Sequence, residues 1–273
     1  WEALHIHAPH FAVFIAPQAK KAGIKKICCH CHTTWYSLFP KNEFRNRLLA
    51  APVKCLAGTC FACGTDAGKF WFKNNFYVLA NAVDCAAFRF DEKRREKARQ
   101  SLGLGDCLVC GNVGRLYPPQ KNHPFILKIF AEVKKQRSDA KLLLVGAEEE
   151  PSLLSLAKKL EIERDVLFLG QRRDVADLLF AMDVFLFPSL REGLPVAAIE
   201  AQASTITREA LVAPNAKMLS LEASPREWAN AAVSAALEAR KDNYDIMKAV
   251  GWDIKDRAAR LAEYYRTGVF RDF

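Results

Sequence analysis

The sequence lacks several patterns that would assign the chain to a common class. No stretch reaches the roughly 18 apolar residues that a membrane-spanning helix needs; the nearest, residues 178–190, contains Asp183. A basic segment followed by an apolar one, the mark of a secretory signal peptide, is missing too. Neither G-x-G-x-x-G nor a P-loop occurs, which argues against a dinucleotide dehydrogenase and a P-loop NTPase. We expect a cytoplasmic protein whose natural start lies upstream of Trp1.

The composition is that of a globular protein, and its charge is unevenly distributed. Hydrophobic residues make up 51% and charged residues 26% of 273 positions. The net charge of +9 is concentrated in residues 1–83, which hold ten Lys/Arg and three Asp/Glu. Such a basic segment indicates an anionic partner, namely phosphate, acidic lipid headgroups or nucleic acid. A solvated basic surface explains the same charge equally well.

Nine cysteines without a secretory signal indicate free thiols in a reducing compartment. Three CxxC pairs occur, at 28/31, 60/63 and 107/110. A zinc site would need the two thiolates of a pair to converge on a tight turn. Each pair lies instead in a strand-like run, where residues three apart point to opposite faces. We therefore expect buried core thiols, and a zinc-dependent nucleic-acid-binding protein stays as the alternative from another class.

Strand-like and helical segments alternate from residue 105 onward. The expected strands are 107–113, 141–145, 166–169 and 184–187, and the expected helices are 122–136, 151–160, 173–181 and 195–203. Residues 1–80 show strands near 4–6, 24–30, 57–62 and 76–79, with a helix near 10–22; further helices are expected at 91–101, 225–240 and 253–267. This alternation predicts two α/β blocks, each built on a parallel sheet.

The segment from Phe185 to Glu200 is the most informative part of the chain. It reads as a buried strand, a short loop and a helix whose first turn contains Pro195. Glu192 and Glu200 then lie at the carboxyl end of a parallel strand, where open α/β sheets bind ligands, and free N–H groups at the helix start suit a phosphate or a sugar hydroxyl. A hydrolytic acid pair needs carboxyls about 5–10 Å apart, whereas eight helical residues span about 12 Å. Two separate contacts to one extended ligand fit this spacing better.

A second loop, after the strand at 107–113, carries Gly114, Arg115 and Lys121. Glycine permits a close approach of the backbone to a ligand, and Arg and Lys suit a diphosphate. Such a loop is more often simply solvated, but together with Glu192 and Glu200 it predicts a nucleotide-diphosphate cleft.

His30 and His32 follow a strand of the first block, and His5 and His7 show the same spacing. A lone histidine is usually structural. We expect residues at this spacing to point to opposite faces, so that at most one reaches a cleft. This expectation argues against a histidine metal site.

Four segments together resemble the retaining glycosyltransferases of family 4. Residues 192–200 resemble the family's E-x7-E signature, and Gly114–Lys121 resembles its diphosphate-binding loop. Asn81–Asp84 resembles the "NGID" interdomain loop, and His30–Thr33 resembles the "HSHNT" segment. The resemblance is to enzymes of bacterial capsular and exopolysaccharide synthesis. It implies an α/β fold of the GT-B type, with two Rossmann-like doubly wound domains.

The resemblance also implies roles for individual residues. Arg115 and Lys121, in the loop that begins at Gly114, would hold the donor's diphosphate and stabilise charge on the leaving group. Glu200 would bind the ribose hydroxyls. The residues that would hold the transferred sugar are Glu192, Gly193, Leu194 and Pro195, together with His32 from the opposite domain. The predicted catalytic residues are thus Glu192, His32, Arg115 and Lys121.

The activity implied is transfer of a sugar from a nucleotide sugar, expected to be UDP-linked, to a lipid-linked polysaccharide precursor with retention. In such enzymes the departing phosphate takes the acceptor's proton, so no protein base, metal or other cofactor is expected. Nucleic acid is not an expected partner, and the basic first block would dock on the anionic inner face of the inner membrane. A truncated, inactive or nucleotide-binding-only relative is the alternative within the same fold.

The resemblance divides the chain into three parts. Residues 1–84 would be a partial acceptor-side domain, 85–251 the nucleotide-sugar domain, and 252–273 a helix that packs back on the first domain. The family's first βαβ unit, with its glycine-rich loop, would precede Trp1, so the N-terminal domain is expected to be incomplete. A strand that the family carries after Ala203 is also missing from the sequence.

Overall fold

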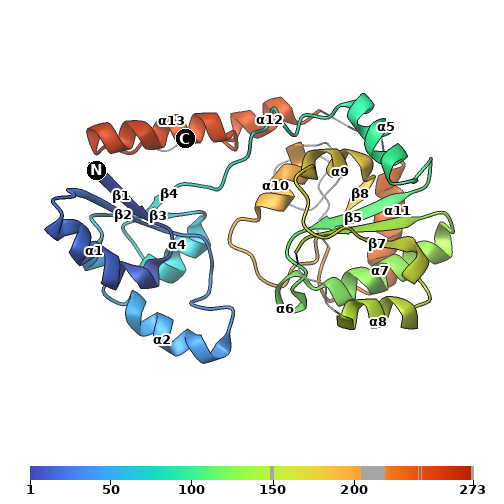
Figure 1. Cartoon of the computed structure of the whole chain (residues 1–273), viewed down its shortest axis with the longest axis horizontal. Coiled ribbons are helices and arrows are strands. Elements are labelled where there is room, and N and C mark those ends of the chain that lie inside the picture. Colours follow the sequence, from blue (N-terminus) through green and yellow to red (C-terminus); the bar gives the residue numbers. More distant parts are fainter. Residues whose placement is uncertain (148–150, 204–218, 239, 241, 272–273) are drawn as a thin grey trace. The chain divides into compact units, whose positions relative to one another are not determined.

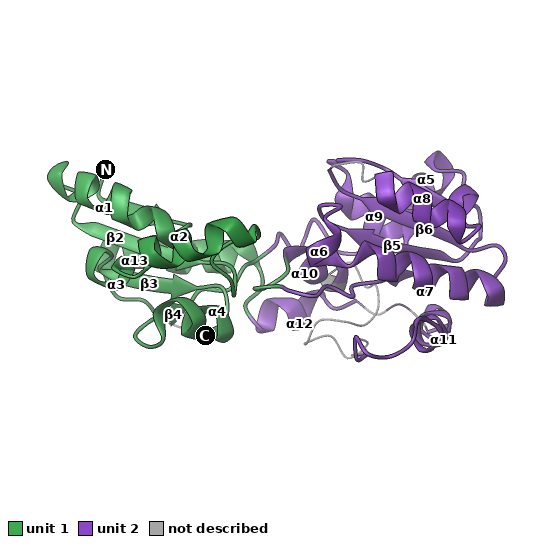
Figure 2. Cartoon of the chain, turned by 90° about the horizontal axis from the view of Figure 1, so that it is seen from below, with its two compact units in different colours: residues 1–82, 192–195, 251–273 green, residues 83–191, 196–250 purple. Residues whose placement is uncertain are grey.

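The computed structural model describes residues 1–147, 151–203, 219–238, 240 and 242–271. The predicted absence of a strand after Ala203 concerns residues outside these ranges. The chain forms two compact units, each with its own parallel sheet (Figure 2). Unit 1 comprises residues 1–82, 192–195 and 251–273, and unit 2 comprises residues 83–191 and 196–250.

Unit 1 is a four-stranded parallel sheet in the order β1-β2-β3-β4. Its elements are β1 (Ala3–Ile6), η1 (Pro9–Phe11), α1 (Ala12–Lys21), β2 (Lys26–Cys31), α2 (Pro40–Ala50), α3 (Val53–Leu56), β3 (Thr59–Ala62), α4 (Thr65–Phe72), β4 (Tyr77–Val78) and α13 (Ile254–Thr267) (Figure 1). The central strands β2 and β3 are buried almost throughout. Continuous apolar runs of this kind are typical of a parallel sheet covered on both faces.

Helix α13 belongs to unit 1, although it lies at the far end of the sequence. Asp253 caps its first turn by accepting a hydrogen bond from the Lys255 N–H, and Gly268 ends it with φ 78°. The Tyr264 hydroxyl donates to Thr59 Oγ1 at 2.6 Å, and the Tyr264 ring packs edge-on against Phe61. One face of the sheet is thus covered by α13, while residues of α1, α3 and α4 pack in a separate buried cluster.

Unit 2 is also a four-stranded parallel sheet, in the order β7-β6-β5-β8. Its elements are α5 (Glu92–Ser101), β5 (Val109–Val113), α6 (Pro118–Lys121), α7 (His123–Gln136), β6 (Lys141–Val145), α8 (Pro151–Lys159), η2 (Glu163–Asp165), β7 (Val166–Phe168), α9 (Val175–Ala181), β8 (Val184–Phe185), α10 (Val196–Ala203), α11 (Pro225–Ala236) and α12 (Tyr244–Ala249).

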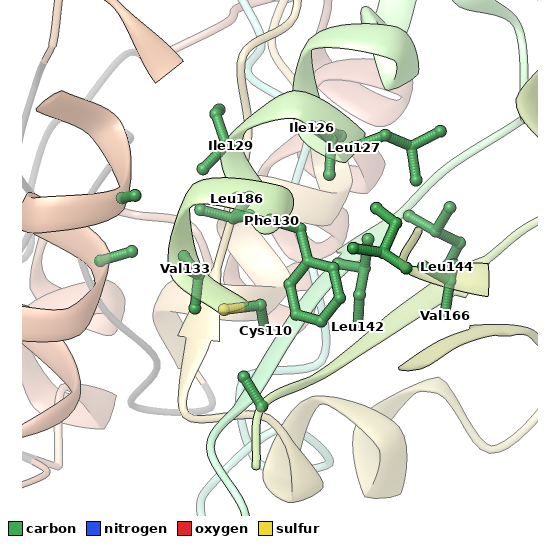
Figure 3. Close-up of a cluster of buried hydrophobic side chains, with 14 of the residues drawn as sticks. Cys110, Ile126, Leu127, Ile129, Phe130, Val133, Leu142, Leu144, Val166 and Leu186 are labelled. Atoms are coloured by element: carbon green, nitrogen blue, oxygen red, sulfur yellow. The ribbon is translucent and has the colours of Figure 1, made fainter. Parts of the chain in front are cut away.

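The core of unit 2 lies on both faces of this sheet. On one face, Phe130 and Val133 of α7 point at Cys110, Leu142 and neighbouring strand residues (Figure 3). Side chains of α5, α9 and α10 form a second buried cluster with the alternate residues of the strands. Burying one such side chain contributes about 1.5–3 kcal/mol, so both helical layers stabilise the sheet.

The structure corrects three details of the predicted elements. Helix α10 begins at Val196, so Pro195 precedes the helix and does not lie in its first turn. The strand expected at 184–187 is assigned only over Val184–Phe185. Helices α2, α3, α4, α6 and α12 were not predicted. The sequence of α2 gives little apolar periodicity, because the only buried residues of this helix are Asn46 and Ala50.

No helix in the described part of the chain is long and apolar enough to cross a membrane.

Candidate functional site

The order of the strands in unit 2 identifies a place where a ligand can bind. The chain runs from β5 to β6 and β7 on one side, and then returns to pair β8 with β5 on the other side. The loops after β5 and β8 therefore leave adjacent strands in different directions. In open α/β sheets such a switch point opens a crevice outside the carboxyl ends of the strands. The loop after β5 carries Gly114, Arg115 and Lys121, and the one after β8 leads to Glu192 and Glu200.

Two glycines let the loops after β5 and β6 approach each other closely. The Gly114 N–H donates to the Val145 carbonyl at 2.8 Å, and Gly114 has φ +153°, which few other residues adopt. A Cβ added to Gly146 would lie 1.9 Å from the Gly114 carbonyl oxygen. Both positions therefore need glycine to hold the backbone before Arg115 in place. The sequence prediction named Gly114 but missed Gly146, whose role depends on a contact between distant segments.

Lys121 lies at the end of α6, beside the loop that begins at Gly114. A Cβ added to Gly114 would lie 3.1 Å from Lys121 Cε, and Lys121 Nζ lies 5.0 Å from the centroid of the Phe187 ring. The Leu190 N–H donates to the Gln120 carbonyl at 2.8 Å, which ties the segment after β8 to α6. The structure thus brings the predicted diphosphate loop together with the segment that precedes Glu192. Arg115 is exposed in this loop.

The Glu200 side chain on α10 is half-buried, and the pKa of its carboxyl is raised. Its neighbours Ala198, Ile199 and Ala201 are buried, and burial raises the pKa of Glu200 to about 7. No cation among the described residues counteracts this effect. A carboxylate in such a position gains strongly from hydroxyl donors that a ligand supplies. This property suits the ribose-binding role predicted for Glu200.

The remaining predicted residues lie in unit 1, around the end of β2. His32 Nδ1 is 3.0 Å from Asn81 Oδ1, and Asn81 Nδ2 donates to the Leu194 carbonyl at 2.6 Å. A Cβ added to Gly193 would lie 2.0 Å from the His32 carbonyl oxygen, so this position also needs glycine. His32, Gly193 and Leu194 are therefore neighbours. The link through Asn81 was not predicted, although its segment had been singled out by the family resemblance.

Glu192 and Pro195 belong to the same segment of unit 1, and both are half-buried. Glu200 belongs to unit 2, so the two acids of the E-x7-E pattern are assigned to different units. The roles predicted for Glu192 and His32 toward a transferred sugar stay predictions.

The structure corrects the expectation about paired histidines. Residues i and i+2 of a strand lie on the same face, because side chains alternate with a period of two. The rings of His30 and His32 have centroids 4.1 Å apart, and those of His5 and His7 are stacked at 4.6 Å. The expectation that the members of each pair point to opposite faces is therefore wrong.

The burial expected for the CxxC thiols is found for all of them except Cys107, with one exception in geometry. None of the nine cysteines forms a disulfide, and seven are buried, the others being the half-buried Cys107 and the exposed Cys55. Cys28 and Cys31 lie in different core clusters, on opposite faces of the sheet. Cys60 and Cys63 share one cluster, because Cys63 lies just beyond the end of β3. No CxxC pair joins a metal-binding group within the described residues.

Comparisons with known proteins identify the family of the chain. A model of the family described as "Glycosyl transferases group 1" matches residues 108–208. The whole chain is similar to "Putative glycosyltransferase EpsF" of Bacillus subtilis strain 168, with 30% identity over 300 residues and coverage of 76% of that protein. The chain belongs to the group 1 glycosyltransferase family. It is therefore a glycosyltransferase, as predicted.

Two further similarities concern the fold and the names that similar proteins carry. Over 224 residues the chain is 34% identical to the Escherichia coli protein named UDP-Gal:alpha-D-GlcNAc-diphosphoundecaprenol alpha-1,3-galactosyltransferase; the match covers 75% of this chain and 56% of that protein. The crystal structure of Anabaena Alr3699/HepE in complex with UDP and glucose superimposes with a TM-score of 0.82 at 18% identity, covering 98% of this chain and 78% of that one. The predicted GT-B fold, with two Rossmann-like domains, is confirmed.

Proposed function

We propose that this group 1 glycosyltransferase moves a sugar from a UDP-linked donor to a lipid-linked saccharide acceptor, with retention of configuration. The observation that carries the proposal is the switch point of unit 2, where Arg115 and Lys121 follow β5 and Glu200 follows β8. The similar Anabaena structure was solved with UDP and glucose, and the similar E. coli protein is named for UDP-Gal and a diphosphoundecaprenol-linked sugar.

The chemistry of transfer explains why these residue types suit the site. Departure of a nucleoside diphosphate places negative charge on its terminal phosphate. The Arg115 guanidinium can bind two phosphate oxygens as a fork, and the Lys121 ammonium acts as a point charge. The Glu200 carboxylate accepts hydrogen bonds from the ribose hydroxyls. The departing phosphate takes the acceptor's proton, so the proposal assigns no protein base, metal or other cofactor to this step. Binding of the transferred sugar by Glu192, His32 and the segment Gly193–Pro195 belongs to the same proposal.

Calorimetric titration with UDP tests the donor part of the proposal. We expect Arg115→Ala and Glu200→Gln each to weaken UDP binding by about 10- to 100-fold, because each removes a charge-assisted hydrogen bond. Lys128→Ala is the matched control, because it removes one positive charge from an exposed position of α7. Equal losses in Arg115→Ala and Lys128→Ala would contradict the assignment, since a general loss of charge would then explain both.

Turnover tests the transfer part. The full chain is incubated with a UDP-sugar and a polyprenyl-diphosphate-linked saccharide, and UDP release is measured with the anomeric configuration of the product. We expect product with the donor's configuration. UDP binding without turnover on any such acceptor would instead support a nucleotide-binding-only relative.

The surface of unit 1 supports docking on an anionic membrane at the cytoplasmic face. Helices α1 and α2 contact each other and carry the exposed apolar side chains Phe14 (57% exposed), Phe44 (71%) and Leu48 (58%). Exposed basic residues lie on the same helices: Lys20, Lys21, Lys41, Arg45 and Arg47. Apolar side chains among cations are typical of surfaces that insert shallowly between anionic headgroups. This surface, over α1 and α2, is our proposed membrane contact.

Vesicle sedimentation tests the contact. We expect the full chain to bind phosphatidylglycerol vesicles more strongly than phosphatidylcholine vesicles. The double substitution Phe44→Ser and Leu48→Ser should weaken binding by about tenfold or more, from the apolar area that no longer inserts. Leu237→Ser is the control, because Leu237 is 78% exposed but belongs to unit 2. Equal binding to both lipids, or equal losses in the two variants, would refute the contact.

A further inference from the structure

Four histidines gather at the carboxyl ends of two adjacent strands in unit 1. His5 lies in β1 and His30 in β2, and His7 and His32 follow just beyond the strand ends. The rings of His5 and His30 have centroids 5.3 Å apart, and those of His7 and His30 are 5.5 Å apart. One ring nitrogen from each of His5, His7 and His30 lies within 4.8 Å of the other two. Three potential ligand atoms therefore face a common point.

The buried members of this cluster have ring nitrogens without good partners. His30 is only 4% exposed, and neither of its ring nitrogens makes a hydrogen bond of normal geometry. The buried Nε2 of His5 has no partner either. Leaving buried polar atoms unpaired is costly. Such atoms in a converging group point to a ligand that would pair them.

Hydrogen bonds around the cluster leave particular nitrogens available. The Asn81 amide donates to Leu194, so its oxygen accepts from His32 Nδ1–H. Nε2 of the neutral His32 then accepts from His7 Nδ1–H at 2.9 Å, which leaves the lone pair on Nε2 of His7. On the other side, His5 Nδ1 lies 2.5 Å from the Tyr265 hydroxyl. A histidine that binds a metal commonly donates its second N–H to such an outer partner.

The residue type and the distances suit a transition metal. Imidazole nitrogens are preferred ligands of Zn²⁺, Cu²⁺ and Ni²⁺. If the ligand atoms were 4.8 Å apart, each would need to move by about 0.7 Å toward the centre to form a Zn–N bond of about 2.1 Å. His7 is exposed and free to make most of this adjustment.

We propose that His5, His7 and His30 form a binding site for a divalent transition-metal ion of the Zn²⁺ class. Three histidines leave a fourth position for water or another ligand. The bound ion would link β1 to β2 and, through His7, fix the orientation of His32. This proposal concerns unit 1 alone and does not depend on the function proposed above. The sequence argued against a histidine metal site because the members of each pair were expected to point to opposite faces. The structure shows that this expectation is wrong.

The direct test is calorimetric titration of the full chain with ZnCl2. We expect one tight site, and His30→Gln should weaken its affinity by at least about 100-fold through loss of a ligand. Tyr265→Phe removes only an outer partner and should weaken affinity by about 10- to 100-fold. His7→Gln changes an exposed side chain, so it tests the site without disturbing the core. His10→Gln is the matched control, because His10 lies outside the metal-binding group.

A second readout separates histidine ligation from binding by thiols. Titration with Co²⁺ should give visible d–d bands without the thiolate charge-transfer band, and Zn²⁺ should raise the melting temperature of the wild-type chain but not that of His7→Gln. Unchanged Zn²⁺ affinity in both His7→Gln and His30→Gln would overturn the proposal. A thiolate band in the Co²⁺ spectrum would also overturn it, and would assign the metal to the cysteines.

Discussion

Glu200 should weaken the fold above neutral pH while it strengthens nucleotide binding. Burial raises its pKa from 4.5 to about 7, so the folded state favours the protonated carboxyl. For a group whose pKa is raised on folding, the associated stability is fully present below the unfolded pKa and is lost as the pH rises through the folded value. The window for Glu200 therefore runs from about pH 4.5 to above pH 7. We predict that Glu200→Gln makes the chain more stable at high pH.

The size of the stability change follows from the pKa of Glu200 in the unfolded chain, 4.5, and in the folded chain, about 7. This difference in pKa corresponds to about 3 kcal/mol of lost stability when the carboxyl is fully ionised, at 1.36 kcal/mol per pKa unit. Because Glu200 is only half-buried, solvent screening reduces the expected gain from Glu200→Gln to about 2 kcal/mol near pH 8. Near pH 5 the carboxyl is protonated in the folded state and only partly ionised in the unfolded state, so the gain should fall to about 0.5 kcal/mol.

As the pH rises, the affinity for UDP should increase while the stability of the wild-type chain decreases. A ligand that donates hydrogen bonds to Glu200 favours its ionised form, so UDP affinity in the wild-type chain should rise as the pH increases through about 7. The glutamine variant should bind UDP about 10- to 100-fold more weakly near pH 8. A residue that costs stability and contributes to binding is typical of a functional site.

Urea denaturation at about pH 5 and about pH 8, together with UDP calorimetry at both values, measures these effects. Glu163→Gln is the control, because Glu163 is an exposed glutamate of the same unit. It should change neither stability nor affinity. If Glu200→Gln lowered stability equally at both pH values, burial would not be the cause of the raised pKa. If UDP affinity stayed constant with pH in the wild-type chain, Glu200 would not contact the nucleotide.

Three further predictions concern contacts that shape the two units. Gly146→Ala should weaken UDP binding by about tenfold, because its Cβ would collide with the Gly114 carbonyl; Gly58→Ala, with 3.7 Å of space, is the control in the same titration. Tyr264→Phe should lower the free energy of unfolding by about 1 kcal/mol through loss of its hydrogen bond to Thr59, measured by urea denaturation. Asp183→Ala should lower it by about 3 kcal/mol, since Arg95 would lose its partner at 2.8 Å; a loss below 1 kcal/mol would contradict this.

The fold of unit 2 could be predicted well because its periodicity is strong. Strand Lys141–Val145 and helices α7 and α9 were predicted to within two residues at each end. Their apolar residues repeat with the period of the element, and both faces of the sheet are buried. Helix α2 was missed, because a surface helix with two buried residues carries almost no periodic signal. The hydrophobic periodicity of a sequence reflects which residues are buried, so a helix that buries few residues is hard to predict.

The candidate site was predicted in part because its residues cluster along the chain. Gly114, Arg115 and Lys121 share one loop, and the acids at 192 and 200 share one segment. Gly146 could not be found in this way, because its importance comes from a carbonyl 32 positions earlier in the sequence. The histidine cluster was missed because the period of a strand was misapplied, although the sequence contained the correct signal.

The burial of the thiols has a practical consequence for labelling. Burial raises the pKa of Cys60 and Cys63 to about 11 and that of Cys110 to about 12, so these thiols react slowly at neutral pH. Cys55 on α3 is the exposed thiol of the nine. Maleimide reagents should therefore attach a fluorophore or spin label mainly to Cys55 without any engineered cysteine. The probe would sit on α3, which leaves the loops after β5 and β8 unmodified for measurements of nucleotide binding.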